Sequence, residues 1–527
     1  MPSFLRIHPG DSVAVALEPL SEGQTLQVEG LSVTLTQDIP AGHKFALTDL
    51  AEGQNVIKYG FPIGHATANI PAGSHVHIHN LKTNLSDTLT YTWQPVATPP
   101  LPVPAPRTFR GYPRKNGRAG IRNEIWIIPT VGCVNGIARS LEREAACLVG
   151  PGVEHVYAFP HPYGCSQMGE DQEHTRAILA DLATHPNAGG VLVLGLGCEN
   201  SGVEEIRSRM GDYDEKRVRF LVCQQVEDEF ASAMALLKEL ADQMREEERV
   251  PCPVSDLVVG LKCGGSDGFS GITANPVIGG LSDRMASLGG SSILTEVPEM
   301  FGAETILMSR CETASLFEKT VALINDFKHY YQENHQTIYE NPSPGNKAGG
   351  ISTLEDKALG CTQKSGFAPV KGVLAYGEKV SVPGLNLLSA PGNDLVAATG
   401  LAASGAQLVL FSTGRGTPFA SPVPTLKIAT NPDLAKKKAN WIDFAAGDLL
   451  LGKTLDQLSN ALLEQVLPLA RDGRRIYLEI KPGPEIVPYV ERILGAQSAA
   501  TPENLLFITF NRATCRALKE AMPRFAA

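Results

Sequence analysis

Three histidines stand at every second position in the segment "GSHVHIHN", at His75, His77 and His79. Successive side chains on a β-strand alternate between two faces, so a strand here would put all three imidazoles on one face. Imidazole is both a proton carrier and a common metal ligand. Neighbours on one strand face lie about 6.6 Å apart, so one metal ion would bind two of the three. We predict that His75 and His77 bind or support a metal ion, with His77 also in a catalytic role, and that the third histidine faces substrate; the alternative is a polar edge strand.

A set of cysteines follows apolar runs, each beside glycine. If those runs are parallel strands, their carboxyl ends gather at the sheet edges where ligands bind. Thiolates are soft ligands that suit iron or zinc. The alternative for each cysteine is a small buried apolar residue. The predicted metal ligands besides the histidines are Cys133, Cys165, Cys198, Cys263 and Glu199, the last directly after Cys198.

Two turns in the first sixty residues carry acid–base groups. "AGHKFALTD" puts His43 beside Lys44, and "VIKYGFPIG" puts Lys58 beside Tyr59. A histidine beside a lysine can serve proton transfer or carboxylate binding. A solvated loop is the alternative at both places. We predict catalytic roles for all four residues.

Polar side chains also follow the later apolar runs. They stand in "CGGSDGFSGITANP", in "RGTP" and in the glycine-bracketed loop "NPSPGNKAGG", which is too long and polar for a tight turn. The alternatives are plain turn chemistry and a mobile surface loop. The predicted substrate-binding residues are Ser266, Asp267, Asn275, Asn346, Lys347 and Arg415.

The elements that must position these residues fall into several regions. Residues 1–95 carry short alternating runs separated by turn residues, which predicts a small β domain. Residues 96–107 are proline-rich and predict a stiff extended linker. Residues 108–470 alternate buried apolar runs with helical patterns such as "EDEFASAMALLKELADQMREEER". This alternation predicts a large α/β body with mainly parallel sheets, in two lobes with a seam near residue 250.

Composition restricts the class of protein. The chain has 527 residues and a formal net charge of −10, which disfavours a general nucleic-acid or anionic-membrane binder. No apolar run reaches the roughly 18 residues that a membrane span needs. The 10 cysteines are widely spread without a CxxC motif, so they do not indicate a disulfide framework. We expect a cytoplasmic enzyme that acts on a small molecule.

The longer motifs carry a family resemblance. "RNEIWIIPTVGCVNGIA", "YGCSQ", "GLGCEN", "CGGSDGFSGITANP", "LTEVPEMFGAE", "YENPSPGNKAGGI", "TLEDKALGCTQK" and "LFSTGRGTP" closely resemble the altronate/galactarate dehydratase family, as do the β-domain motifs quoted above. The resemblance runs from about residue 5 to about residue 470. It implies an amino-terminal SAF (β-clip) domain, a dehydratase body and dependence on Fe²⁺, with Mn²⁺ as the alternative.

The same resemblance implies a reaction. The expected one is dehydration of D-altronate to 2-dehydro-3-deoxy-D-gluconate plus water, in hexuronate breakdown. The galactarate branch lacks the HxHxH run, so the histidines favour the altronate branch. The alternatives are a galactarate or other aldonate dehydratase and, from another class, an inactive sugar-acid-binding protein. The expected partner is a small sugar acid, and a homodimer stays open.

Residues 471–527 depart from that family. "RRIYLEIKPGPEIVPYVERIL" and "NLLFITFNRATCRALKEAM" each predict a strand followed by a helix. They resemble an internal piece of the glycerophosphodiester phosphodiesterase barrel, with Glu479 and Lys481 at the matching strand end. A (β/α)₈ barrel needs eight such units in about 250 residues, so this fragment cannot supply that activity alone.

We therefore expect the chain not to hydrolyse glycerophosphodiesters. Deleting the segment after Leu469 should leave sugar-acid dehydration unchanged or improve solubility, because two strands without a barrel contribute exposed edges. The measurement is dehydration rate and soluble yield of the shortened and full chains. Hydrolysis of a glycerophosphodiester that is lost in Glu479→Ala would contradict the fragment interpretation.

Overall fold

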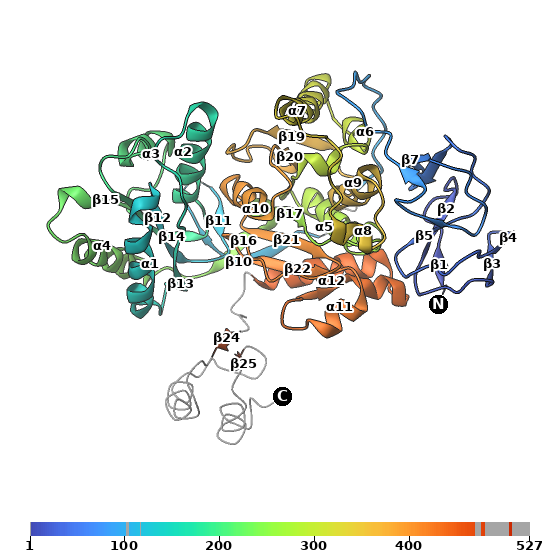
Figure 1. Cartoon of the computed structure of the whole chain (residues 1–527). Coiled ribbons are helices and arrows are strands. Elements are labelled where there is room, and N and C mark those ends of the chain that lie inside the picture. The colour runs from blue at the N-terminus through green and yellow to red at the C-terminus, as the bar shows by residue number, and fades with distance from the viewer. Residues whose placement is uncertain (1, 102–104, 116, 470–475, 480–504, 509–527) are drawn as a thin grey trace. The chain divides into compact units, whose positions relative to one another are not determined.

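The computed structural model describes residues 2–101, 105–115, 117–469, 476–479 and 505–508. Residues 1–464 and 465–527 are separate compact units. Figure 1 shows the elements in chain order. Short strands come first, and strands alternating with helices follow, so the expected α/β architecture is confirmed. No helix of the described residues is long and apolar enough to cross a membrane.

The amino-terminal β domain consists of short antiparallel strands. Valine and isoleucine side chains from these strands form its interior, because alternate positions face inward. The strands are β1 (Phe4–Leu5), β2 (Val13–Ala16), β5 (Lys44–Ala46) and β8 (His75–Val76) in one sheet, the hairpin β3 (Thr25–Val28) and β4 (Leu31–Thr34), and β6 (Asn55–Lys58), β7 (Phe61–Ala66) and β9 (Leu81–Lys82) in another.

The strand expected through all three histidines is wrong in its extent. β8 ends at Val76, so His77 and His79 lie beyond it. The Asn80 side chain accepts a hydrogen bond from the His77 N–H and donates one to the His75 carbonyl, at 2.9 Å each. These bonds turn the chain out of the sheet, so the three histidines do not share one strand face.

The first lobe of the body is a parallel sheet of four strands with helices on both faces. Its order is β13 (His155–Ala158), β12 (Glu124–Pro129), β14 (Ala188–Gly195) and β15 (Val218–Val222). Ile125 and Ile127 pack with α1 (Asn135–Glu144) and α4 (Glu229–Met244), whereas Trp126 and Ile128 pack with α2 (Gly169–Ala183) and α3 (Val203–Arg209). Alternate side chains of one buried strand thus supply two cores.

The second lobe contains a parallel sheet of seven strands. Its order is β19 (Val370–Leu374), β20 (Gly384–Leu388), β18 (Ser291–Leu294), β17 (Val258–Cys263), β21 (Leu408–Thr413), β22 (Thr425–Ala429) and β23 (Phe444–Ala445). Its helices are α5 (Ala274–Ser287), α6 (Glu304–Met308), α7 (Ala314–Glu333), α8 (Pro344–Ala348), α9 (Leu354–Thr362), α10 (Asp394–Ala403) and α11 (Pro432–Lys437). Helix α12 (Leu455–Leu469) follows and contains the boundary between the two units.

The chain passes between the lobes through a small antiparallel sheet. It consists of β11 (Ala119–Gly120), β10 (Thr108–Pro113) and β16 (Val250–Pro253). One hydrophobic cluster joins Trp126 and Val191 of the first lobe to Leu401 and Val409 of the second. The lobes therefore share buried apolar surface.

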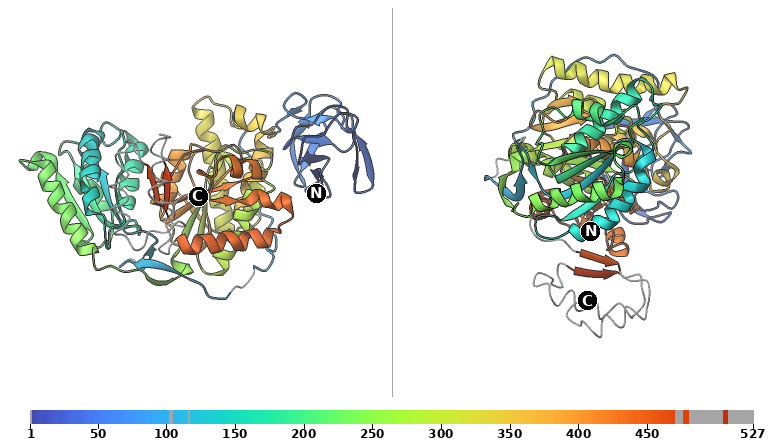
Figure 2. Two further views of the ribbon diagram at one scale, coloured as in Figure 1. Left: turned by 90° about the horizontal axis from the view of Figure 1, so that it is seen from below. Right: turned by 90° about the vertical axis from the view of Figure 1, so that its left-hand side faces the viewer.

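Two further strands are described near the carboxyl terminus. β24 (Ile476–Glu479) and β25 (Leu505–Ile508) pair in parallel, and Figure 2 shows them side by side. They correspond to the two strands expected in that segment. The helices expected after each strand, and the packing of the segment, lie outside the described residues.

Candidate active site

The β domain approaches the second lobe through close backbone contacts. A Cβ atom built on Gly268 would lie 2.0 Å from the Gly42 carbonyl oxygen, and one on Gly350 would lie 2.2 Å from the same oxygen. A side chain at either position would push the backbones apart, so glycine permits the contact. The contact places His43 and Lys44, which follow Gly42, against the segment before α9.

A buried carboxylate, Asp356 in the first turn of α9, binds two lysines of the β domain. Lys44 Nζ donates to Asp356 Oδ2 and to the Gly350 carbonyl, both at 2.8 Å, and Lys58 Nζ donates to Asp356 Oδ1 at 2.9 Å. Burial raises the pKa of Asp356, but the two ammonium groups outweigh it and hold that pKa below its ordinary value. Asp356 is therefore charged and links the two domains.

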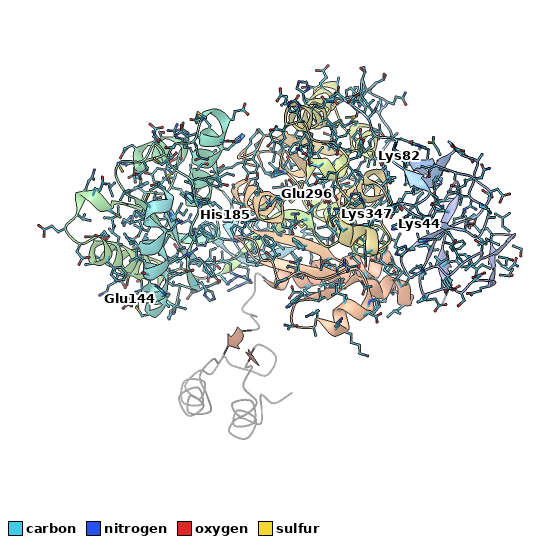
Figure 3. All side chains as sticks on the ribbon, in the orientation of Figure 1. Lys44, Lys82, Glu144, His185, Glu296 and Lys347 are labelled. Atoms are coloured by element: carbon cyan, nitrogen blue, oxygen red, sulfur yellow. The ribbon has the colours of Figure 1, made fainter. Side chains whose placement is uncertain are left out.

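The two lysines differ in how firmly they hold a proton. Burial lowers the pKa of Lys44 to about 8, against the attraction of Asp356. For Lys58, burial is outweighed by Asp356, and the pKa lies above its ordinary value. Lys44 is fully buried, so it acts through its neighbours rather than on a ligand. Figure 3 shows Lys44 on the β domain and Lys347 on α8.

Three histidines converge beside this ion pair. His43 Nδ1 lies 3.0 Å from His75 Nε2, and His77 Nδ1 lies 3.3 Å from Ser352 Oγ. Ligand atoms of His43, His75 and His77 all lie within 4.8 Å of one another. Burial is the main cause that lowers the pKa of each, to about 3 for His75 and about 4 for His77. The third member is thus His43 from another turn, while His79 is exposed.

A small cavity of about 10 Å³ lies next to these groups, lined by Lys58, Tyr59, Ser266, Asp356 and Cys361 among others. Tyr59 has a φ of 61°, a strained left-handed conformation for a bulky residue. Burial raises its pKa to about 12, so its hydroxyl keeps its proton. The buried Ser266 Oγ has no hydrogen-bond partner in the described part of the chain, which is the mark of a missing water or ligand.

The predicted substrate-binding residues divide into two kinds. The first kind is available: Lys347 on α8 is half-buried, without a side-chain partner among the described residues. Its neighbour Asn346 belongs to the second kind, because its Nδ2 donates to the Ser266 carbonyl at 2.9 Å and its Oδ1 accepts from the Ser343 N–H at 3.1 Å. Arg415 is exposed and borders α8, because its Nε would lie 3.8 Å from a Cβ on Gly345. Lys347 and Arg415 therefore supply two cationic side chains beside α8.

The other kind is already saturated by protein contacts. Asp267 accepts hydrogen bonds from Thr430 Oγ1 at 2.9 Å and 3.0 Å and from Asn431 Nδ2 at 3.1 Å. Asn275 donates to the Gly360 carbonyl at 2.9 Å and accepts from Ser412 Oγ at 2.6 Å. Both line the cavity, but their hydrogen bonds hold its walls together, and the structure offers little of either to a substrate.

Behind the cavity lies a buried network of thiols, carboxylates and lysines. Cys263 and Cys361 both donate to Glu299 Oε2, at 3.2 Å and 3.1 Å, and Lys357 Nζ lies 2.7 Å from Glu299 Oε1. Lys364 Nζ lies 2.9 Å from Cys263 Sγ. The hydrogen bond with Cys361 and the nearby lysines lower the pKa of Cys263 to about 6, so this thiol is the more easily ionised.

The structure separates the predicted thiol ligands. Cys263 ends a strand of the seven-stranded sheet, whereas Cys133, Cys165 and Cys198 follow strands of the four-stranded sheet. All four cysteines follow apolar strands beside glycine, which is why they were predicted together. That pattern does not reveal which sheet each strand joins. The four thiols and the histidines therefore do not form one ligand set.

Glu199 is also engaged as a structural group. It accepts hydrogen bonds from Thr130 Oγ1 and from the Gly197 N–H, both at 2.6 Å. Burial raises its pKa, but these bonds outweigh it and lower the pKa overall. Both carboxylate oxygens fix the loop after β14, so Glu199 is not available as a metal ligand in this conformation.

Two groups of described residues bring three metal-ligating atoms within 4.8 Å of one another: His43, His75 and His77, and Cys263, Glu299 and Cys361. In the second group, Lys364 and Lys357 already neutralise the thiol and the carboxylate, so a metal ion would compete with two ammonium groups. The histidines are neutral imidazoles, the form that binds Fe²⁺ and similar ions. The histidine group therefore fits a divalent metal better.

Several residues at the site were not predicted from the sequence. Asp356, Lys357, Cys361 and Lys364 all belong to the segment "TLEDKALGCTQK". The segment was quoted only for its family resemblance, and the burial that sets its charged residues apart comes from the fold. A wider groove of about 980 Å³ lies elsewhere, beside the linker and α6, and contains none of the predicted residues.

Comparison with known proteins follows the same order along the chain. Residues 2–84 match the altronate/galactarate dehydratase SAF domain, residues 111–245 match the D-galactarate dehydratase/altronate hydrolase second domain, and residues 254–491 match the D-galactarate/altronate dehydratase C-terminal domain. The last match extends past residue 470, where the sequence resemblance was expected to end.

Similar whole proteins bear the same family names. Altronate dehydratase of Escherichia coli (strain K12) is 54% identical over 89% of this chain and 95% of that protein. Altronate dehydratase of Bacillus subtilis (strain 168) is 54% identical over 85% of this chain and 90% of that protein. Galactarate dehydratase (L-threo-forming) of E. coli is 32% identical over 90% of this chain and 94% of that protein. Three family models match successive segments of the chain, and the similar proteins cover most of its length. The chain therefore belongs to the altronate/galactarate dehydratase family.

Proposed function

We propose that this chain is a hydro-lyase that dehydrates D-altronate to 2-dehydro-3-deoxy-D-gluconate and water. Two altronate dehydratases share 54% identity with most of its length. The observation in the structure that carries the assignment is the Lys44–Asp356–Lys58 link, because it joins an acid–base turn of the β domain to the body at a cavity lined by polar groups. Dehydration of a hydroxy acid needs such a combination of cations, proton carriers and an enclosed space.

Substrate binding uses the available cations. The substrate is an anion, and Lys347 and Arg415 border the region between α8 and the loop after β21. Their charges fit the carboxylate, while Ser266 Oγ, which has no partner among the described residues, is offered to a sugar hydroxyl. A cavity of about 10 Å³ holds little more than a water molecule, so the walls must separate to admit the substrate.

The chemical step moves the C2 proton through water to solvent and expels the C3 hydroxyl, which leaves as water once it is protonated. Negative charge grows on the substrate carboxylate as the proton leaves, and the Lys58 ammonium stabilises it, because its raised pKa keeps it charged. Tyr59 Oη holds a proton and fits the acid that protonates the departing hydroxyl. Lys44 does not contact the cavity; it positions His43 and Asp356.

A divalent metal fits the histidine group. His43, His75 and His77 would hold it, with Fe²⁺ as the expected ion and Mn²⁺ as the alternative. When bound, it supplies a Lewis acid for the carboxylate and hydroxyl of a hydroxy acid. The protein's own contribution is to keep the three imidazoles neutral and close together.

The test of the substrate is an anaerobic assay with Fe²⁺ across altronate, galactarate and other aldonates, measuring the 2-keto product. We expect product from altronate. Product from galactarate alone would assign the sister activity, and measurable binding without product would indicate a sugar-acid-binding protein.

The metal-binding role of the histidine group can be tested by substitution and by metal removal. His43→Ala, His75→Ala and His77→Ala should each lower turnover by more than about tenfold, or roughly 1.4 kcal/mol of transition-state stabilisation, and lower bound metal in parallel. His329→Ala on α7 is the matched control, since His329 is exposed and outside the group. Chelation should abolish activity, and Fe²⁺ or Mn²⁺ should restore it. Full activity in metal-free protein would exclude the metal.

The proton-donor role of Tyr59 can be tested by removing its hydroxyl. Tyr59→Phe should lower kcat by about 100-fold or more with little change in KM, since general acid catalysis contributes about 10² to 10⁴ in rate. Tyr330→Phe, at an exposed position, controls for loss of a hydroxyl. Equal kcat in Tyr59→Phe and the unaltered chain would rule out the proton-donor role.

A further inference from the structure

Three cysteines of the first lobe lie outside the site described above. Cys133 follows β12, Cys165 follows β13 and Cys198 follows β14, and each comes directly after a glycine. The three strands are neighbours in one parallel sheet, in the order β13, β12, β14. The cysteines therefore leave the same edge of the sheet in adjacent loops.

Direct hydrogen bonds join these three loops. The Gly132 N–H donates to the Tyr163 carbonyl at 3.0 Å, and the Ser201 N–H donates to the Gly164 carbonyl at 3.1 Å. Gly164 has a φ of 105°, and a Cβ there would lie 2.1 Å from the Thr130 carbonyl oxygen. The backbone beside each cysteine is thus fixed against the next loop.

The thiols themselves face solvent. All three are free and exposed, although cysteine is among the most buried residue types in proteins. The hydroxyl of Ser201, three residues after Cys198, is fully buried and has no partner within the described residues. The loop after Cys198 thus holds a buried polar atom whose partner is absent from the described structure.

The spacing of the thiols argues against a single metal ion. Ligands of one tetrahedral ion with bonds of about 2.3 Å must lie roughly 4 Å apart. Cys133, Cys165 and Cys198 are not among the described groups whose ligand atoms all lie within 4.8 Å of one another. Glu199, the carboxylate directly after Cys198, is already engaged by Thr130 and backbone N–H groups.

We propose that Cys133, Cys165 and Cys198 bind an iron–sulfur cluster. In such a cluster each thiolate binds a different iron, so the three sulfur atoms need not reach one ion. Each thiol releases its proton to solvent when it binds iron. Arg176 Nη2 donates to the Asn200 carbonyl at 2.6 Å and Nη1 pairs with Glu173, so this side chain fixes the loop after Cys198. Three thiolates leave one iron of a four-iron cluster without a protein sulfur, and that iron takes an oxygen ligand from solvent or a small hydroxy acid.

The experiment measures iron and acid-labile sulfide in the full chain purified without oxygen. We expect both, in comparable amounts, with the visible absorbance of iron–sulfide charge transfer. Cys133→Ser, Cys165→Ser and Cys198→Ser should each lower bound sulfide by at least about tenfold, since even an outer partner of a metal ligand is worth about 10-fold to 100-fold in affinity. Cys147→Ser, an exposed cysteine of the same lobe outside these loops, should retain the cluster.

Alkylation of the unaltered protein provides a measurement that does not depend on how the variants fold. Mass spectrometry should find Cys147 modified and the three proposed ligands protected. Iron without sulfide, absence of both, or unprotected thiols at these positions would overturn the proposal. None of these readouts uses dehydratase activity, so the cluster and the dehydration reaction succeed or fail separately.

Discussion

The buried carboxylate of Asp356 is the interaction on which the candidate active site depends. It accepts one hydrogen bond from Lys44 and one from Lys58, both from the β domain, while its backbone belongs to α9 of the body. Removing one partner of a buried ion pair costs about 3–5 kcal/mol, because a charge is left without compensation. One carboxylate also cannot fully neutralise two ammonium groups. The two lysines therefore differ in pKa: that of Lys58 lies above its ordinary value, and that of Lys44 is lowered to about 8.

Apolar and backbone contacts support the same junction. Val56 and Ile63 of the β domain share a hydrophobic cluster with Ala358 and Leu359 of α9. The glycine contacts at Gly42 and Gly268 bring the backbones close enough for the short Lys44–Gly350 hydrogen bond. Burial of these surfaces lowers the local dielectric, which strengthens the ion pair and also keeps the neighbouring imidazoles neutral. The proton states of the site therefore follow from how the domains meet.

The two clusters of ligating atoms near the junction show how charge decides between structure and metal binding. In the histidine group the imidazoles are uncharged, with His75 half-buried and His43 and His77 buried. The Cys263–Glu299–Cys361 group is closed and paired with lysines. A negative group that already has ammonium partners is satisfied, so a divalent cation gains little by entering. This second network serves to hold the strand ends and α9 in place.

Sequence alone determined much of this protein, because local patterns are physical signals. Buried apolar runs identified β12, β14, β17 and β21, and the dense motifs carried the family. It also indicated the chemistry of His43, Lys44, Lys58, Tyr59, Ser266 and Lys347, which the structure brings to one junction. Tertiary structure decided which groups meet. The loop of Asn80 ends β8, so His43 replaces His79 in the histidine group. Sheet order places Cys263 apart from Cys133, Cys165 and Cys198. The role of Asp356 depends on the contact between the β domain and α9. Strand pairing and domain docking join residues hundreds of positions apart, and such contacts leave no periodic pattern in the sequence.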